Sequence, residues 1–179
     1  MKYILITRHA KSSWDFPELD DIDRPLNSRG EKNAMSQGLE IKRLKMIPDK
    51  VICSPATRTV ATGAIMVDLW HLSQKNISVD EHLFHGRIKD YFKSIEQTDP
   101  QHNRLMFIGH EPDLSALISH LTDVDIEHFP TAAYCQIEFP VNSWKELSDG
   151  QIKGRITHLK APRKSTEEMA PGLELPDVE

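Results

Sequence analysis

The sequence has little cysteine and no long apolar run. Only two cysteines, Cys53 and Cys135, occur among 179 residues, and each stands in a short apolar stretch. A free thiol in such a place usually packs as a small buried hydrophobe, so a disulfide framework is excluded. No segment approaches the roughly 20 apolar residues of a membrane span, and the apolar run near the N-terminus is too short for a signal peptide. We therefore predict a cytoplasmic protein with no membrane partner.

The chain also lacks a surplus of positive charge and any recognisable metal motif. Lys and Arg number 22 against 27 Asp and Glu, a net charge of −5, which excludes broad nucleic-acid binding. Neither His-Glu-x-x-His nor Cys-x-x-Cys spacing occurs, and His82, His85, His120 and His128 fall in different segments. We predict surface histidines, no metal and no cofactor, so any phosphate chemistry must come from a local basic pocket.

Short apolar runs alternate with helix-like segments, which is typical of an α/β domain with a mostly parallel sheet. The expected strands cover 4–6, 51–53, 77–79 and 105–108, and the alternating runs 134–139 and 154–159 predict two more strands with one wet face. A capping-box pattern, Ser28 with Glu31, predicts a helix that ends before Pro48. Further helices are expected from Pro55, over about 88–96, and from Pro112.

The expected domain spans 1–160, a length that buries a complete core. From 161 to 179 the composition turns to proline and acidic residues, which predicts a flexible tail without a role in the chemistry. The stretch 14–27, rich in Asp and Pro, predicts a long loop after the first strand. Long loops at strand ends often belong to active sites.

Polar residues follow three of the predicted strands. Arg8-His9 ends the first strand, Arg58 falls in the first helical turn after the second, and His110 follows the fourth. Ligands of open α/β sheets bind at the carboxyl ends of strands, so these side chains converge if the strands are neighbours. Arginine forks and a helix N-terminus suit phosphate oxygens.

With no metal expected, the chemistry must use side chains alone. A neutral histidine can attack phosphorus, and His9 is the candidate nucleophile, forming a phosphohistidine that water then hydrolyses. Arg8, Arg58 and a protonated His110 are expected to hold the phosphoryl oxygens. For the proton of the leaving group, we predict Glu81 as general acid, with two rivals. The rivals are Glu111 and Asp113, which follow His110.

These residues stand in motifs that resemble one family. The motifs are Arg8-His9-Ala10, Arg24-Pro25-Leu26 ahead of Gly30, Ser54-Pro55-Ala56-Thr57-Arg58 with Thr62, and Gly109-His110. Together they resemble the histidine phosphatase superfamily over most of the chain, to about residue 139. The short length, with no inserted cap domain, is similar to the small phosphohistidine phosphatases.

This resemblance implies a three-layer α/β/α sandwich of the phosphoglycerate mutase type. It places the family's nucleophile on His9, the phosphate-binding arginines on Arg8 and Arg58, and the second histidine on His110. Two departures stand out. Ala10 replaces the family's usual glycine, and the residues around Glu81 match only loosely the sequence that carries an acid in mutase-like members.

The predicted function is removal of phosphate from phosphohistidine proteins, because a phosphohistidine has a good leaving group and needs a proton donor least. Three alternatives stay open. One is a phosphatase of small phosphomonoesters, another is an inactive module that binds a phosphorylated ligand, and the third is a metallohydrolase.

Overall fold

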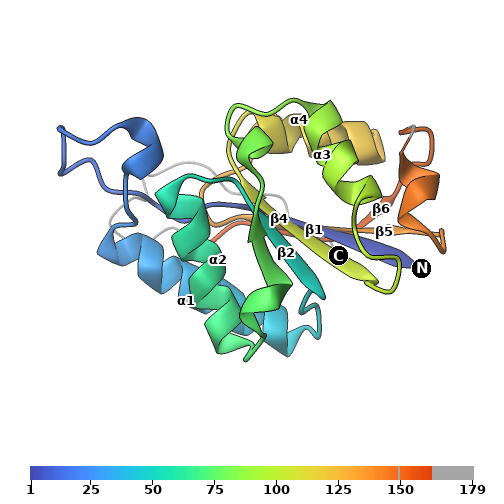
Figure 1. Ribbon diagram of the computed structural model, residues 1–179, viewed down its shortest axis with the longest axis horizontal. Helices are drawn as coiled ribbons and strands as arrows, with labels where there is room; N and C mark the ends of the chain where they lie inside the picture. The colour runs from blue at the N-terminus through green and yellow to red at the C-terminus, as the bar shows by residue number, and fades with distance from the viewer. Residues whose placement is uncertain (149, 163–179) are drawn as a thin grey trace, which may run out of the picture.

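The computed structural model describes residues 1–148 and 150–162, and a six-stranded sheet forms its centre (Figure 1). The strands are β1 (Lys2–Arg8), β2 (Lys50–Cys53), β3 (Ile77–Val79), β4 (Arg104–Gly109), β5 (Tyr134–Phe139) and β6 (Arg155–Lys160). Their order across the sheet is β3-β2-β4-β1-β5-β6. The first four strands run parallel, and β5 is antiparallel to both β1 and β6. This confirms the predicted α/β class with a mostly parallel sheet.

Two pairs of helices cover the two faces of the sheet (Figure 1). On one face lie α1 (Ser28–Arg43) and α2 (Thr57–Leu69), and on the other α3 (Ile88–Glu96) and α4 (Asp113–Thr122). Short 3-10 turns join these elements, among them η1 (Asp21–Asp23) and η3 (Glu81–Leu83). The result is the three-layer arrangement that the family resemblance implies.

Each face of the sheet has its own hydrophobic core, because successive side chains of the central strands point alternately to the two faces. In β4, Leu105 and Phe107 pack under α3 and α4, whereas Met106 and Ile108 pack under α1 and α2. All four side chains are fully buried. Because successive side chains of a strand point to opposite faces, a run of apolar residues is what a central strand needs when both faces are covered.

Three expectations about these elements are wrong in detail. Asn27 caps α1, accepting a hydrogen bond from the Gly30 amide at 2.8 Å, so Ser28 is the first helical residue and no box with Glu31 forms there. Helix α2 begins at Thr57, with Ala56 as its N-cap residue, and not at Pro55. Strand β5 is buried on both faces except at Glu138, because Cys135, Ile137 and Phe139 pack in the core under α3 and α4 while Tyr134 packs in the core under α1 and α2.

The described residues contain no helix long and apolar enough to cross a membrane. Cys53 and Cys135 are both buried free thiols, as predicted. Most of the predicted tail, from 163 onward, lies outside the described residues.

Candidate active site

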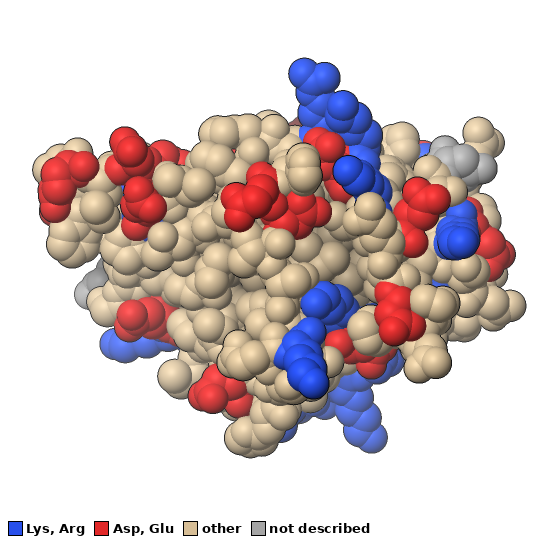
Figure 2. All heavy atoms as spheres, viewed as in Figure 1, with Lys and Arg blue, Asp and Glu red and all other residues tan. Residues whose placement is uncertain are grey.

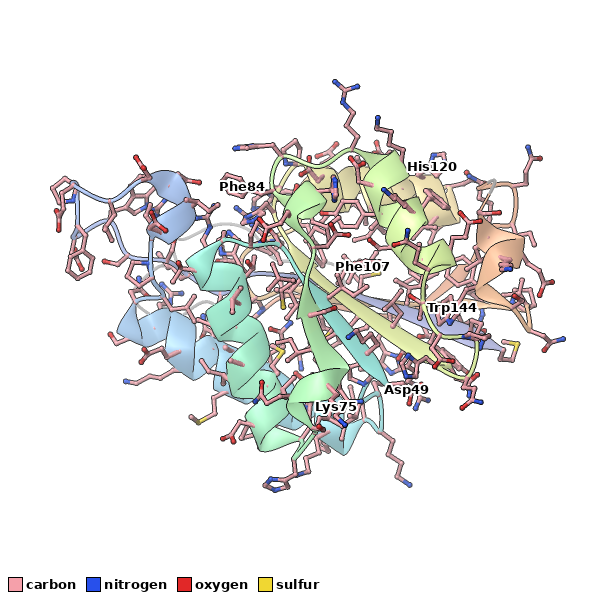
Figure 3. The ribbon with its side chains drawn as sticks, viewed as in Figure 1. Asp49, Lys75, Phe84, Phe107, His120 and Trp144 are labelled. Carbon is pink, nitrogen blue, oxygen red and sulfur yellow. The ribbon has the colours of Figure 1, made fainter. Side chains whose placement is uncertain are left out.

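The polar residues predicted to converge do lie together, because their strands are neighbours. Strand β4 lies between β1 and β2, with Arg8 opposite Gly109 and Cys53 opposite Ile108. One cavity of about 460 Å³ at the carboxyl edge of the sheet is therefore lined by all four predicted residues, Arg8, His9, Arg58 and His110. Phe84, which also lines this cavity, marks that edge in Figure 3, whereas Asp49 and Trp144 mark the opposite edge.

His9 is held in one orientation and one tautomer. Its backbone amide donates to the Gly109 carbonyl at 3.1 Å, and its own carbonyl accepts from the Ala132 amide. On the ring, Nδ1 lies 2.8 Å from the carbonyl oxygen of Ala10. A carbonyl oxygen only accepts, so Nδ1 carries the proton and Nε2 keeps its lone pair. This is the tautomer that a nucleophilic histidine needs at Nε2.

Burial keeps the His9 ring neutral. The side chain is 7% exposed, and desolvation lowers the pKa of His9 from 6.5 to about 4. Positive charge on Arg58 and Arg8 works in the same direction, although the bond to Ala10 opposes it. At neutral pH the ring is therefore unprotonated and able to attack.

Ala10, where the family usually has glycine, needs no special backbone conformation here. Its side chain is fully buried with Leu26, Ala34 and Ala132, and it is not among the residues with positive φ. Its amide donates to the hydroxyl of Thr62 on α2 at 3.0 Å. The methyl group therefore fills a small core beneath the pocket and fixes the turn after β1.

Two arginines bring positive charge to the pocket from different elements. Arg8 donates to the Phe129 carbonyl at 2.9 Å, while its buried Nε has no hydrogen-bond partner among the described residues. Arg58, 6% exposed, projects from the first turn of α2 and donates to the backbone and side chain of Asp21. Both side chains lie where forked donors could grip a phosphoryl group beside His9.

His110 lies beside His9, with ring centroids 5.1 Å apart. Its Nε2 is 2.8 Å from the Ser54 hydroxyl, and Arg58 donates to its Nδ1 at 3.4 Å. Burial, then His9 and Arg58, lowers the pKa of His110 to about 3. The ring is thus neutral at pH 7 without substrate, so the protonated His110 that we expected needs the negative charge of a bound phosphoryl group.

Asp21 and Arg24 belong to the pocket although no site role was predicted for them. Asp21 lies in η1 and forms ion pairs of 2.9 Å with both Arg58 and Arg24. Burial alone would raise the pKa of Asp21, but hydrogen bonds from Arg24 and Arg58 lower it overall, so this carboxylate stays charged. The sequence feature that could have indicated these two residues is the Asp-rich loop followed by Arg24-Pro25.

The candidate general acids fall in two places. Glu81 is exposed and lines a separate cavity of about 620 Å³ between β3 and α3, not the cavity of His9. Glu111 and Asp113 do line the His9 cavity. Burial raises the pKa of Asp113; the charge of His85 opposes this effect and the charge of Glu111 adds to it. Glu111 itself accepts a 2.5 Å hydrogen bond from the Ser115 hydroxyl. The geometry thus favours Asp113 over Glu81 as a proton donor.

The part of the chain that the structure describes holds no group of three His, Cys, Asp or Glu side chains suited to a metal ion. His82 pairs with Asp80 at 3.0 Å outside the His9 cavity, whereas His85 lines it. The absence of a metal and of a cofactor stays a prediction.

The site thus has Arg8 at the end of β1 with His9 directly after it, and a second histidine, His110, directly after the neighbouring strand β4. Residues 4–83 match the family model of the histidine phosphatase superfamily (branch 1), which confirms the family resemblance found in the sequence. An uncharacterized chloroplast protein of Arabidopsis thaliana is 26% identical over 172 residues, covering 90% of this chain and 78% of that protein.

Two solved structures show the same fold. The protein histidine phosphatase SixA, complexed with tungstate, superposes with a TM-score of 0.72 at 20% identity, covering 88% of this chain and 95% of that one. A mycobacterial glucosyl-3-phosphoglycerate phosphatase gives 0.66 at 12% identity, covering 87% and 97%. These likenesses confirm the predicted phosphoglycerate mutase-like fold class.

Proposed function

We propose that the protein is a phosphohydrolase that removes the phosphoryl group from phosphohistidine side chains of proteins in the cytoplasm, without a metal ion. The observation that carries this proposal is the state of His9. It is neutral, protonated at Nδ1, and lies beside Arg8, Arg58 and His110 in one cavity. The resemblance to SixA supports the choice of phosphohistidine as substrate.

The reaction proceeds in two transfers. The lone pair of His9 Nε2 forms a bond to phosphorus as the bond from phosphorus to the substrate imidazole nitrogen breaks, and that nitrogen takes up a proton from water. Arg8 and Arg58 hold the non-bridging oxygens of the phosphoryl group. The negative charge of these oxygens raises the pKa of His110, so that His110 becomes protonated and is a further hydrogen-bond donor. Water then attacks phosphorus, which releases inorganic phosphate and restores neutral His9.

Substrate preference tests this proposal. The enzyme is expected to release phosphate from a phosphohistidine peptide at least about 100-fold faster, in kcat/KM, than from phosphoserine peptide or sugar phosphates, because a protonated imidazole leaves far more readily than an alkoxide. Phosphate release is measured in the presence of EDTA, which should change neither rate. A higher kcat/KM on the monoesters, or loss of activity with EDTA, would contradict the proposal.

A second candidate is a phosphatase of small phosphomonoesters, and Asp113 favours it. An alkoxide leaving group needs a proton, and a carboxyl with raised pKa in the His9 cavity can supply one. If this function holds, Asp113→Asn should lower kcat on a sugar phosphate by roughly 100-fold, since general acids contribute 10²–10⁴-fold. Glu81→Gln is the matched control and should leave the rate unchanged.

The same pair of variants separates the two functions. On a phosphohistidine peptide, Asp113→Asn should cost little, because the leaving imidazole can take its proton from water. A loss in Glu81→Gln alone would show that the acid predicted from the sequence acts through a rearranged η3 turn.

A further inference from the structure

The loop between β1 and α1 combines two kinds of exposed side chain. Nine large apolar side chains are exposed in the described residues, and three of them lie in a six-residue stretch of this loop. They are Trp14, Phe16 and Leu19, at 77%, 47% and 39% exposure. Within residues 14–23, five of ten are acidic and none is basic. This segment projects from the body of the molecule in Figure 1, and acidic atoms gather over it in Figure 2.

The base of this loop is firmly tied to the domain. Ser12 and Leu26 form a β-bridge, and the Ser13 amide donates to the Pro25 carbonyl at 2.9 Å. Arg24, 8% exposed, crosses the base and donates to the Ser13 carbonyl and the Ser12 hydroxyl. Because its base is fixed, the loop loses less conformational entropy when a partner binds to it.

The loop is also continuous with the phosphate pocket. Trp14 lines the cavity and lies on the Arg24 guanidinium, 3.2 Å from ring centroid to Cζ, while Asp21 reaches Arg58 inside it. A macromolecule whose phosphorylated side chain enters the cavity would lie against the exposed residues beyond Trp14. Phe16 and Leu19 do not line the cavity, so a ligand confined to it makes no contact with them.

We propose that residues 14–23 are a docking element for the protein substrate, one that recognises a basic and partly apolar surface around the phosphorylated side chain. The inference rests on the proposed function. Exposed apolar side chains gathered at one place indicate an interaction site, and the acidic residues among them select a partner of positive charge. The acidic side chains also repel anionic small molecules that lack such a surface.

Two synthetic peptides of equal length test the choice of partner. Each carries one phosphohistidine, flanked in the first by lysine and leucine and in the second by glutamate and leucine. The wild-type enzyme is expected to show kcat/KM roughly tenfold higher on the lysine peptide at low salt, and the ratio should shrink in 0.5 M NaCl, where exposed charges are screened. Reversing two charges, with Glu18→Lys and Asp20→Lys together, should remove the preference.

The apolar part is tested with a double variant at exposed positions, Phe16→Ser with Leu19→Ser. It is expected to lose roughly tenfold in kcat/KM on the lysine peptide, with less than about a twofold change on free phosphohistidine. The matched control is Met35→Ser with Leu39→Ser on α1, where both side chains are similarly exposed, at 50% and 51%. This control should act on every substrate as the wild type does.

The outcomes separate the two proposals. Equal rates on the two peptides, or no effect of the Phe16 and Leu19 changes, would overturn the docking element while the phosphohistidine activity stands. An equal loss on peptide and free phosphohistidine would also overturn it, because the loop would then act by shaping the pocket. If no phosphohistidine substrate is hydrolysed while a sugar phosphate is, the proposed function fails and the docking element fails with it.

Discussion

Replacing His9 with asparagine is expected to reduce kcat/KM on a phosphohistidine peptide by roughly 10⁴-fold or more, because loss of a nucleophile removes the covalent route altogether. Asparagine retains a donor that can reach the Ala10 carbonyl, so the backbone hydrogen bonds to Gly109 and Ala132 should persist. The loss would then come from the missing Nε2 and not from a collapsed pocket.

Trapping the intermediate gives the direct measurement. Wild-type enzyme that is mixed with labelled substrate and quenched in alkali should carry acid-labile phosphate, and the asparagine variant should carry none. His82→Asn, an exposed histidine outside the cavity, is the control and should behave as wild type. Labelled phosphate on the His9 variant, or more than a tenth of wild-type activity, would rule out His9 as the nucleophile. Trapped phosphate on the wild type would exclude an inactive binding module.

The pocket could be predicted because ligands of open α/β sheets bind at the carboxyl ends of the strands, and the sequence shows which residues stand there. Arg8, His9 and His110 each directly follow or end a strand, and parallel strands place their carboxyl ends at one edge. The one condition that the sequence left open was the strand order, which needs β4 between β1 and β2. The α1 cap was assigned wrongly because Asn27 and Ser28 are both good N-cap residues, and only the geometry chooses between them.

Other features depend on long-range packing, to which no local pattern points. Asp21 reaches Arg58 because the β1–α1 loop folds back over α2, and loop paths are not encoded in periodicity. Glu81 follows β3, but β3 is the edge strand farthest from β1, so the end of that strand opens into a different cavity. The charge state of His110 follows from its burial beside His9 and Arg58, which only the assembled site creates.

The two buried histidines should make the fold sensitive to acid before its carboxylates titrate. The pKa values of His9 and His110 are lowered to about 4 and about 3 in the folded chain, against about 6.5 when unfolded. Below pH 6.5 the unfolded chain therefore binds protons that the folded chain does not, and stability falls as the pH falls. The pKa values of Asp21 and Asp80 are lowered in the folded chain, so their contributions are lost only as the pH falls below about 4.

Between pH 7 and pH 5 the free energy of unfolding is expected to fall by about 2 kcal/mol for each ring, since one unit of pKa difference corresponds to about 1.36 kcal/mol. Urea unfolding at pH 7, 6 and 5 measures this. Asp113, whose pKa is raised by burial, acts in the opposite direction and is common to all variants. His110→Asn should halve the fall, and His9→Asn with His110→Asn should nearly abolish it. A wild-type unfolding free energy that stays constant across this range would show that the two rings are not kept neutral by burial, which would remove the physical basis for His9 as an unprotonated nucleophile.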